Sequence, residues 1–280
     1  SFRGRYYIAI SAQAKAEDRR ARANKRYFLG NARIEKYVLG KLGRGWSPEQ
    51  IAGRLKLRYR RTVVSHEAIY QYVYKEENKK LALWEYLRRG QKKRRRHRGR
   101  SVHHGRIPLR VSIRVRPEDI SRREEFGHWE GDTMEGRGHR DGLHAETERL
   151  SGYLIAGFVS AICSEATIAV QKQQFAALPE IARKSTTLDN GRENHLHFQL
   201  QELGMNTYFC DPYSSWQKGT VENTIGLIRS YLPKRTDLAR LSSAELADIV
   251  EEINTRPRKR LGYNTPKEVF TSYLKVALQS

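Results

Sequence analysis

The positive charge of this chain lies almost entirely in its first half. Residues 1–127 contain 35 Lys and Arg but only 12 Asp and Glu, whereas residues 128–280 contain 18 and 19, so the net charge of +22 comes from the front. Cations at this density cannot share a core, because each buried charge would need a partner. We therefore expect a basic front that meets a polyanion and a nearly neutral back that holds the larger core. A ribosomal-type or histone-like tail on an unrelated domain is the alternative.

Cysteine and hydropathy patterns narrow the setting. Cys163 and Cys210 stand far apart without His or Cys at ligand spacing, which argues against a zinc site and a disulfide framework and fits a reducing, cytoplasmic setting. The longest nearly apolar stretch, Tyr153–Cys163, is too short to span a bilayer, so no membrane partner is expected. The chain begins at Ser1 rather than Met, which fits a fragment or a processed product.

The front divides into a basic N-terminal segment, residues 1–30, and a compact helical module, residues 31–87. In the segment, Ala12–Arg26 is expected to form a helix with mostly charged faces, which alone would be marginal. In the module, Ser47 and Gln50 stand at the N-cap and third positions of a helix, where together they predict a capping box.

The last helix of the module is expected to read DNA. Ser65 is placed to cap a helix over residues 65–74, and a basic turn separates it from the helix over 47–57. Three short helices with such a turn indicate a helix-turn-helix module whose last helix enters the major groove. The predicted DNA contacts of this module are Arg54, Arg60, Arg61, His66 and Gln71. A plain three-helix bundle is the alternative.

Residues 88–127 are predicted to be a basic linker. Nine of the thirteen residues 88–100 are Lys or Arg, a density that prevents a core and favours ordering along phosphates. A solvated tail or a localisation signal is the alternative. The predicted phosphate contacts are Arg94, Arg95 and Arg96. Farther along, apolar residues alternate as in an edge strand, at Val111, Ile113 and Val115.

From His128 the pattern changes to alternating strands and helices, and residues 128–280 are expected to form the catalytic domain. The predicted strands are 129–135, 143–149, 153–161, 186–188 and 206–210. The predicted helices are 164–178, capped by Ser164, and 194–203, 218–231 and 242–254. Antiparallel strands followed by alternating helices and strands predict an α+β fold, a mixed five-stranded sheet with flanking helices.

Three acidic residues lie at positions where the presence of a carboxylate needs an explanation. Asp132 lies inside a predicted strand, Asp189 at the end of another, and Glu222 in the first turns of a helix. A carboxylate in a mainly apolar strand is costly unless it is paired or bound to metal, and oxygen-only ligands suit Mg²⁺ or Mn²⁺. Two such ions about 3.5–4 Å apart stabilise both reacting oxygens in phosphodiester transfer. Singly, each acid is weak: Asp-Asn-Gly is more often a turn, and Glu222 fits an ordinary exposed position.

Six blocks of sequence carry a family resemblance. They are WSPEQIAGRL (46–55), VSHEAIYQYVY (64–74), GHWEGDTMEG (127–136), TLDNGREN (187–194), DPYSSWQKGTVENTIGLIRSYLPK (211–234) and NTRPRKRLGYNTPKEVF (254–270). In content and order they resemble the hallmark blocks of insertion-sequence transposases of the IS-thirty family, within the Asp-Asp-Glu transposase and integrase superfamily. The resemblance implies an RNase H-like catalytic fold and a triad at Asp132, Asp189 and Glu222 that holds two Mg²⁺ or Mn²⁺ ions.

The resemblance also bears on the helix that carries Glu222. Arg229, seven positions later on the same helical face, matches a basic residue that such enzymes keep near DNA, and Lys218 is predicted as a further DNA contact. Two features depart from the family. Its members usually start with another helix-turn-helix, and this chain begins where that one would end. The second strand is unusually acidic, and Glu146 and Glu148 are interpreted as salt-bridge partners or as signs of drift in a decaying copy.

Other candidates remain open. Tyr213 and Trp216 precede the Glu222 helix and either stack on a flipped or unpaired base or anchor their loop. Three histidines are interpreted as solvated or structural rather than catalytic: His128, His195 and His197. A basic cluster is predicted to touch phosphates: Arg256, Arg258, Lys259 and Arg260.

The sequence thus predicts a DNA transposase that reads terminal inverted repeats and performs metal-dependent strand cleavage and strand transfer. Synapsis of two DNA ends implies a homodimer or a higher oligomer, on the nucleoid of a bacterial-type cytoplasm. The first alternative is a catalytically inactive or truncated transposase that acts as a DNA-binding regulator. The second is a ribonuclease of the same fold, which would cut RNA in a hybrid duplex rather than repeat-end DNA.

Overall fold

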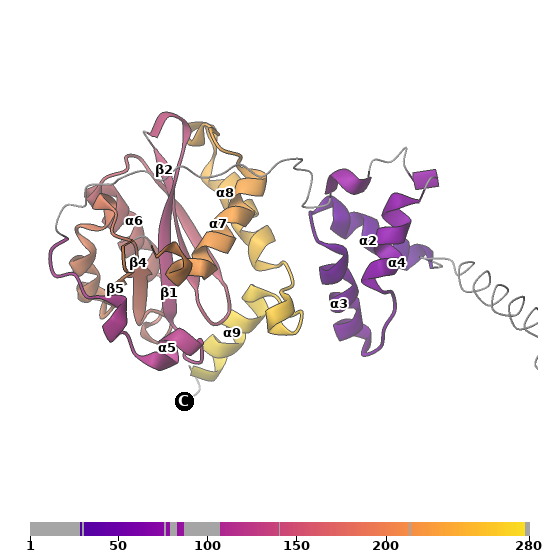
Figure 1. Ribbon diagram of the computed structural model, residues 1–280, viewed down its shortest axis with the longest axis horizontal. Coiled ribbons are helices and arrows are strands. Elements are labelled where there is room, and N and C mark those ends of the chain that lie inside the picture. The colour runs from indigo at the N-terminus through magenta and orange to yellow at the C-terminus, as the bar shows by residue number, and fades with distance from the viewer. Residues whose placement is uncertain are drawn as a thin grey trace, which may run out of the picture. The chain divides into compact units, whose positions relative to one another are not determined.

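The computed structural model describes residues 29, 31–75, 77–78, 83–86, 107–139, 141–212 and 214–277. It divides into two compact units, Ser1–Arg95 and Arg96–Ser280 (Figure 1). The predicted helix 12–26 and the basic run 88–100 lie outside the described residues. Within the described ranges, every helix is too short or too polar to cross a membrane.

The front unit packs three short helices, α2 (Ala32–Gly43), α3 (Pro48–Tyr59) and α4 (His66–Tyr74), with the 3₁₀ helix η2 (Leu83–Tyr86) (Figure 1). Their facing sides close one apolar core: Val38, Leu42, Trp46, Ile51, Leu55, Val64, Ile69, Val73 and Leu83. The three predicted helices are therefore confirmed, and they are consistent with the helix-turn-helix prediction.

Two serine caps set where these helices begin. At α3, Ser47 Oγ accepts the Gln50 amide at 3.2 Å and Gln50 Oε1 accepts the Ser47 amide at 2.9 Å. The predicted capping box is thus confirmed. At α4, Ser65 Oγ accepts the Ala68 amide at 3.1 Å, so this predicted cap is confirmed as well.

The back unit is built on a mixed five-stranded sheet in the order β3-β2-β1-β4-β5. The strands are β1 (His128–Glu135), β2 (Gly142–Glu148), β3 (Leu154–Val159), β4 (Ser185–Leu188) and β5 (Asn206–Phe209). The first three run antiparallel to one another, whereas β4 and β5 run parallel to β1. The predicted α+β fold with a mixed five-stranded sheet is confirmed.

Helices cover both faces of this sheet (Figure 1). Because successive side chains of a strand point to opposite faces, Met134 of β1 enters the core beneath α7 and α8, whereas Trp129 enters the core beneath α6 and α9. The α-helices of this unit are α5 (Glu118–Arg122), α6 (Ser164–Ala176), α7 (Gly219–Tyr231), α8 (Ser243–Asn254) and α9 (Pro266–Ala277). The 3₁₀ turns are η3 (Ile113–Val115), η4 (Arg137–His139), η5 (Glu180–Ala182), η6 (Arg192–Asn194), η7 (His197–Leu203), η8 (Ser215–Lys218), η9 (Leu238–Arg240) and η10 (Lys259–Leu261).

The predicted edge strand at 111–115 is reduced to one bridge: Ser112 pairs in parallel with Phe209 of β5, and the Phe209 amide donates to the Val111 carbonyl at 2.8 Å. Ile113–Val115 is a 3₁₀ turn, started by Ser112, whose Oγ accepts the Arg114 amide at 3.3 Å. Pro117 follows closely and has no N–H to offer a neighbouring strand. Val111 and Val115 stay exposed, whereas Ile107, before this stretch, joins Leu188 and Phe209 in a small apolar cluster.

Three further local predictions need correction. Cys163 stands at the N-cap of helix α6 without a side-chain capping hydrogen bond, and the predicted cap Ser164 is the first residue of the helix. The predicted helix 194–203 is two 3₁₀ turns, η6 and η7. Helix α9 was not predicted, although Thr265 Oγ1 accepts the Glu268 amide at 3.1 Å and Glu268 Oε2 accepts the Thr265 amide at 2.9 Å, a capping box readable from the sequence.

Candidate active site at the carboxylate pair

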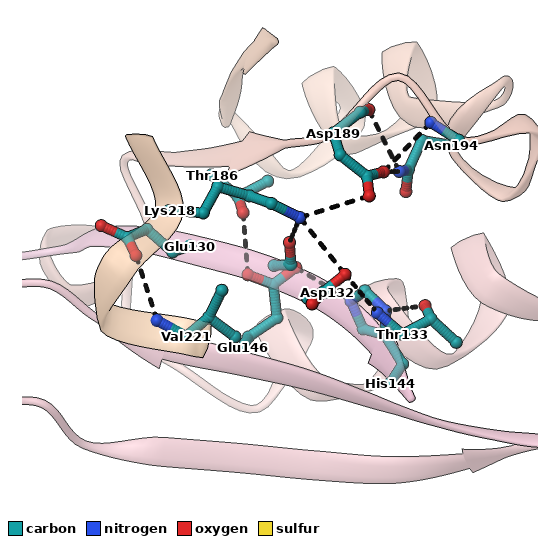
Figure 2. A network of polar contacts seen from close by, with 12 residues as sticks. Glu130, Asp132, Thr133, His144, Glu146, Thr186, Asp189, Asn194, Lys218 and Val221 are labelled. Atoms are coloured by element: carbon teal, nitrogen blue, oxygen red, sulfur yellow. Dashed lines mark hydrogen bonds and ion pairs between the residues drawn. The ribbon is translucent and has the colours of Figure 1, made fainter. Parts of the chain in front are cut away.

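Two of the predicted site residues lie side by side on adjacent parallel strands. β1 pairs with β4 in a register that sets Glu130 opposite Thr187, so Asp132 and Asp189, each two residues farther along, reach the same level of the sheet. Lys218, at the start of α7, inserts its ammonium group between them (Figure 2). Its Nζ lies 3.2 Å from Asp132 Oδ1 and 3.5 Å from Asp189 Oδ2, and it donates to the Gly131 carbonyl at 3.0 Å.

The charges in this cluster perturb one another. Only 4 % of Lys218 is exposed, and burial alone would lower the pKa of its ammonium, but the adjacent Asp132 and Asp189 carboxylates raise that pKa above its ordinary value. Burial raises the pKa of Asp132, although the Lys218 ammonium opposes the rise. Burial together with the like charges of Asp189 and Asp132 also raises the pKa of Glu193. The site thus concentrates negative charge around one cation.

Asp189 is held in place by the turn that follows its strand. Its Oδ1 accepts the Gly191 amide at 3.0 Å and the Asn194 side-chain amide at 2.9 Å, while Oδ2 faces Lys218 (Figure 2). The Asp-Asn-Gly turn weighed above as an ordinary alternative is therefore present, and it orients the carboxylate. Glu193, near this turn, was not predicted as a site residue. The only signal for it in the sequence is its position four residues after Asp189.

Glu222 is the third predicted site residue. It is exposed in the first turn of α7, four residues after Lys218. Across the described ranges, no three acidic, His or Cys side chains converge as a metal would require. The three-residue triad therefore stays a prediction.

Glu130 joins the strand of Asp132 to the helix of Glu222. It is fully buried and, two residues before Asp132, lies on the same face of β1. Its Oε2 accepts the amides of Thr220 and Val221 at 2.8 and 3.1 Å, which caps the first turn of α7 (Figure 2). Its Oε1 accepts from the Arg149 guanidinium, whose Nε donates to the Ile120 carbonyl at 3.1 Å. This capping role of Glu130 was not predicted from the sequence, where its only signal is an acidic residue two positions before Asp132.

The unusual acids of β2 support the opposite face of the sheet. Glu146 is fully buried and accepts from His144 Nε2 at 3.0 Å, Gln171 Nε2 at 3.0 Å and Thr186 Oγ1 at 2.8 Å (Figure 2). A Cβ atom on Gly131 would lie only 2.5 Å from Glu146 Oε1, so the residue before Asp132 has to be glycine.

Glu148 closes the β2–β3 turn by accepting the Ser151 amide at 2.6 Å and the Gly127 amide at 3.3 Å. Together with Glu146 it therefore organises the fold through hydrogen bonds. This is a structural role, and the interpretation of these acids as drift in a decaying copy is not needed.

The predicted DNA contacts of the front unit are mostly at its surface. Arg60 and Arg61 in the turn, and His66 and Gln71 on α4, are exposed, and Arg54 on α3 is half-buried. The predicted contacts Arg94, Arg95 and Arg96 lie outside the described residues. The exposure of these residues does not test whether they contact DNA, so all of these DNA contacts stay predictions.

In the back unit several candidates are already engaged. Arg229 donates to the Glu135 carbonyl at 2.8 Å, and Lys218 is buried in the site. Arg256 is buried, with Nη2 donating to the Tyr231 hydroxyl at 2.8 Å, so its predicted phosphate contact is wrong. Arg260 donates to the Leu150 carbonyl at 2.7 Å. The phosphate contacts predicted for Arg258 and Lys259 stay predictions.

The histidines serve local structure, as interpreted. His128 contacts Ser185 Oγ at 2.7 Å and Glu125 at 3.0 Å, and His195 contacts the Arg192 carbonyl at 2.7 Å. His197 contacts Thr207 Oγ1 at 2.7 Å.

The sequence relatives of this chain define its class: they are insertion-sequence transposases. The chain is 36 % identical to the transposase for insertion sequence element IS4351 of Bacteroides fragilis, over 95 % of this chain and 81 % of the relative. It is 39 % identical to transposase InsI for element IS30A of Escherichia coli strain K12, over 95 % of this chain and 71 % of the relative. The chain belongs to the IS30 family of transposases.

One more sequence relative and one structural neighbour were found. The chain is 37 % identical to the transposase for element IS1086 of Cupriavidus metallidurans, over 83 % of this chain and 70 % of the relative. The catalytic core domain of BIV integrase is a structural neighbour with a TM-score of 0.44 at 16 % identity, over 54 % of this chain and 98 % of that one. No protein-family model matches the chain.

Proposed function

We propose that this chain, a transposase by its family, binds the terminal inverted repeats of an insertion sequence and cuts and joins DNA strands as a metal-dependent polynucleotidyl transferase. The observation that carries the proposal is the convergence of Asp132 and Asp189 on one buried cation, the Lys218 ammonium. Acids on neighbouring parallel strands that share a positive charge are suited to a divalent cation.

The donor chemistry fits Mg²⁺ or Mn²⁺. Asp132 and Asp189 offer oxygen ligands only, and burial, together with the nearby charges of Asp189 and Asp132, raises the pKa of Glu193. We assign the two metal ions to Asp132 and Asp189, with Glu222 of α7 as the third ligand. Bound there, two ions would stabilise charge on the attacking and leaving oxygens of phosphodiester transfer.

The chain's own residues prepare this site. Glu130 holds the start of α7 against β1, and Asn194 with the Gly191 amide orients Asp189. The α3–α4 pair of the front unit presents exposed basic residues to the repeats, and the basic run 88–100 adds salt-sensitive affinity. We propose a homodimer or higher oligomer on DNA, because two ends must be held together, and a place on the nucleoid, where the substrate lies.

Asp132→Asn tests the catalytic part of this proposal. The substitution keeps the shape of the side chain and removes its charge, so repeat-end binding should persist while Mg²⁺-dependent cleavage falls by several orders of magnitude. Asp248→Asn, on α8 and outside the site, is the matched control and should leave both unchanged. If the wild-type chain binds the repeat but cleaves nothing with Mg²⁺ or Mn²⁺, the DNA-binding regulator is the correct reading.

A further inference from the structure

Trp216 is displayed at the surface beside the carboxylate pair. It lies in η8, two residues before Lys218, and 73 % of its surface is exposed. A single exposed aromatic residue is ordinary on a protein surface, so exposure alone does not indicate a binding site, and the location of Trp216 is the relevant observation. The exposure does decide one open question: Trp216 does not anchor its loop by packing. Tyr213 lies outside the described residues.

The two residues that follow the indole are fixed by their side chains. Gln217 Oε1 accepts the Asp211 amide at 2.8 Å, and Gln217 Nε2 donates to Asp211 Oδ2 at 3.2 Å. The next residue, Lys218, is 4 % exposed and lies between Asp132 and Asp189. Trp216 is therefore held in place before any ligand arrives, which lowers the entropic cost of binding one.

Two arginines lie along the same edge of the sheet. Arg114 Nε contacts Asp211 Oδ1 at 3.2 Å, while 77 % of the Arg114 side chain remains exposed. Arg110 donates to Asn190 Oδ1 at 2.8 Å and to the Cys210 carbonyl at 3.0 Å, which places it next to Asp189. Both come from the stretch predicted as linker, and both are anchored to loops that border the carboxylate pair. Guanidinium groups fixed in this way are suited to phosphate oxygens.

We propose that Trp216, Arg110 and Arg114 form a strand ledge for an unpaired nucleotide, with a base stacked on the indole and its phosphates against the two arginines. An aromatic face combined with fixed cations suits single-stranded nucleic acid, because every base has a face to stack while the cations follow the backbone. The inference rests on the proposed function only in taking DNA as the substrate. It adds that the strand beside Asp189 is bound in an unpaired form.

The test compares the full chain on a short blunt DNA duplex and on the same duplex with an unpaired 3′ tail carrying 2-aminopurine, both in EDTA so that only binding is read. Wild type should bind the tailed duplex more tightly and quench the 2-aminopurine. Trp216→Ala should lose about tenfold in affinity for the tailed duplex, together with the quenching, and keep its affinity for the blunt duplex. Trp216→Phe should retain most of both signals. Val276→Ala, an equally exposed apolar side chain on α9, is the control and should change nothing.

The arginines are tested by salt dependence, which counts phosphate contacts. Arg114→Gln should lower the salt slope of tailed-duplex binding by about one unit. Arg122→Gln removes a similar surface arginine, which pairs with Glu118 on α5, and should leave the slope unchanged. Equal changes in the two variants would overturn the role given to Arg114.

An unaltered preference for the tail in Trp216→Ala, or an equal loss on both duplexes, would overturn the ledge. This failure is distinct from failure of the proposed function. Absent cleavage with an intact tail preference counts against the catalytic proposal alone, whereas cleavage without any tail preference counts against the ledge alone.

Discussion

The two units of this transposase treat charge in opposite ways. In the described part of the chain, every buried polar or charged side chain lies at His128 or beyond. The front unit closes an apolar core and leaves Arg60, Arg61 and His66 in solvent. The back unit buries Glu130, Glu146 and Lys218 and satisfies them with hydrogen bonds over long sequence distances.

This difference separates two uses of charge. Exposed cations can attract a polyanion from outside without a fixed geometry. Buried charges cost desolvation and are stable only when their partners are placed well, so they impose one arrangement on the elements that carry them. In the back unit that arrangement brings β1, β4 and α7 to the carboxylate pair.

The contrast between the two units predicts its largest effect on stability at Glu130. Glu130→Ala would leave the Arg149 guanidinium and the first amides of α7 buried without their partner, so the free energy of unfolding of the back unit should fall by about 3–5 kcal/mol. Glu118→Ala removes the exposed partner of Arg122 and should cost about 0.5 kcal/mol or less. Denaturant unfolding of the two variants measures both, and equal costs would contradict the view that buried charge shapes the site.

A smaller loss is expected at Lys218. Lys218→Met keeps much of the volume but leaves Asp132 and Asp189 without their shared cation, which should cost about 1–3 kcal/mol. Added Mg²⁺ or Mn²⁺ should then raise the thermal midpoint of Lys218→Met more than that of wild type, because the variant's carboxylates lack any other cation.

The matched control for Lys218→Met lies in the front unit. Arg61→Met removes an exposed cation and should leave stability unchanged with or without metal. A metal-induced shift of equal size in wild type, Lys218→Met and Arg61→Met would show that the ions do not bind at the carboxylate pair.

The helices of the front unit begin at local capping hydrogen bonds, so removing a helix cap is expected to destabilise this unit. Ser47→Ala removes the hydrogen bond that Ser47 Oγ accepts from the Gln50 amide and should destabilise this unit by about 1 kcal/mol. Thr62→Ala, in the exposed turn before α4, is the control. Hydrogen exchange resolved by residue should show faster opening of α3 in Ser47→Ala and no change in the back unit; a response spread over both units would mean that they unfold together.

The smallest effect expected is a dependence on pH. Burial lowers the pKa of His128 below its ordinary value, although the Glu125 carboxylate opposes this. The unfolded chain therefore takes up the proton at a higher pH than the folded unit does, and the back unit loses stability as the pH falls below about 6.5.

His128→Gln isolates this contribution. The free energy of unfolding of the back unit should vary less with pH in His128→Gln than in wild type over this window. His66→Gln, in the front unit, is the control and should keep the wild-type dependence. An unchanged dependence in His128→Gln would assign the effect to another group, of which His197, whose pKa burial also lowers, is the first to examine.

Much of the fold could be predicted because its signals are local. Ser47, Gln50 and Ser65 predicted where α3 and α4 begin, since a cap and its amide lie within one turn. Alternation predicted the five strands to within a few residues. The prediction for 111–115 was only partly right because three alternating apolar residues suit an edge strand and a turn equally: Ser112 alone pairs with β5, and the chain then turns at Ile113–Val115.

By itself, the sequence determined the elements of this protein, the division of its charge and, through family resemblance, the acids to examine. Only the tertiary structure decided that Lys218 lies between Asp132 and Asp189 and that Glu130 caps the first turn of α7. The Glu130–Thr220 contact spans 90 positions. No periodicity or cap encodes such a contact, because it exists only once the sheet has brought distant segments within hydrogen-bonding distance.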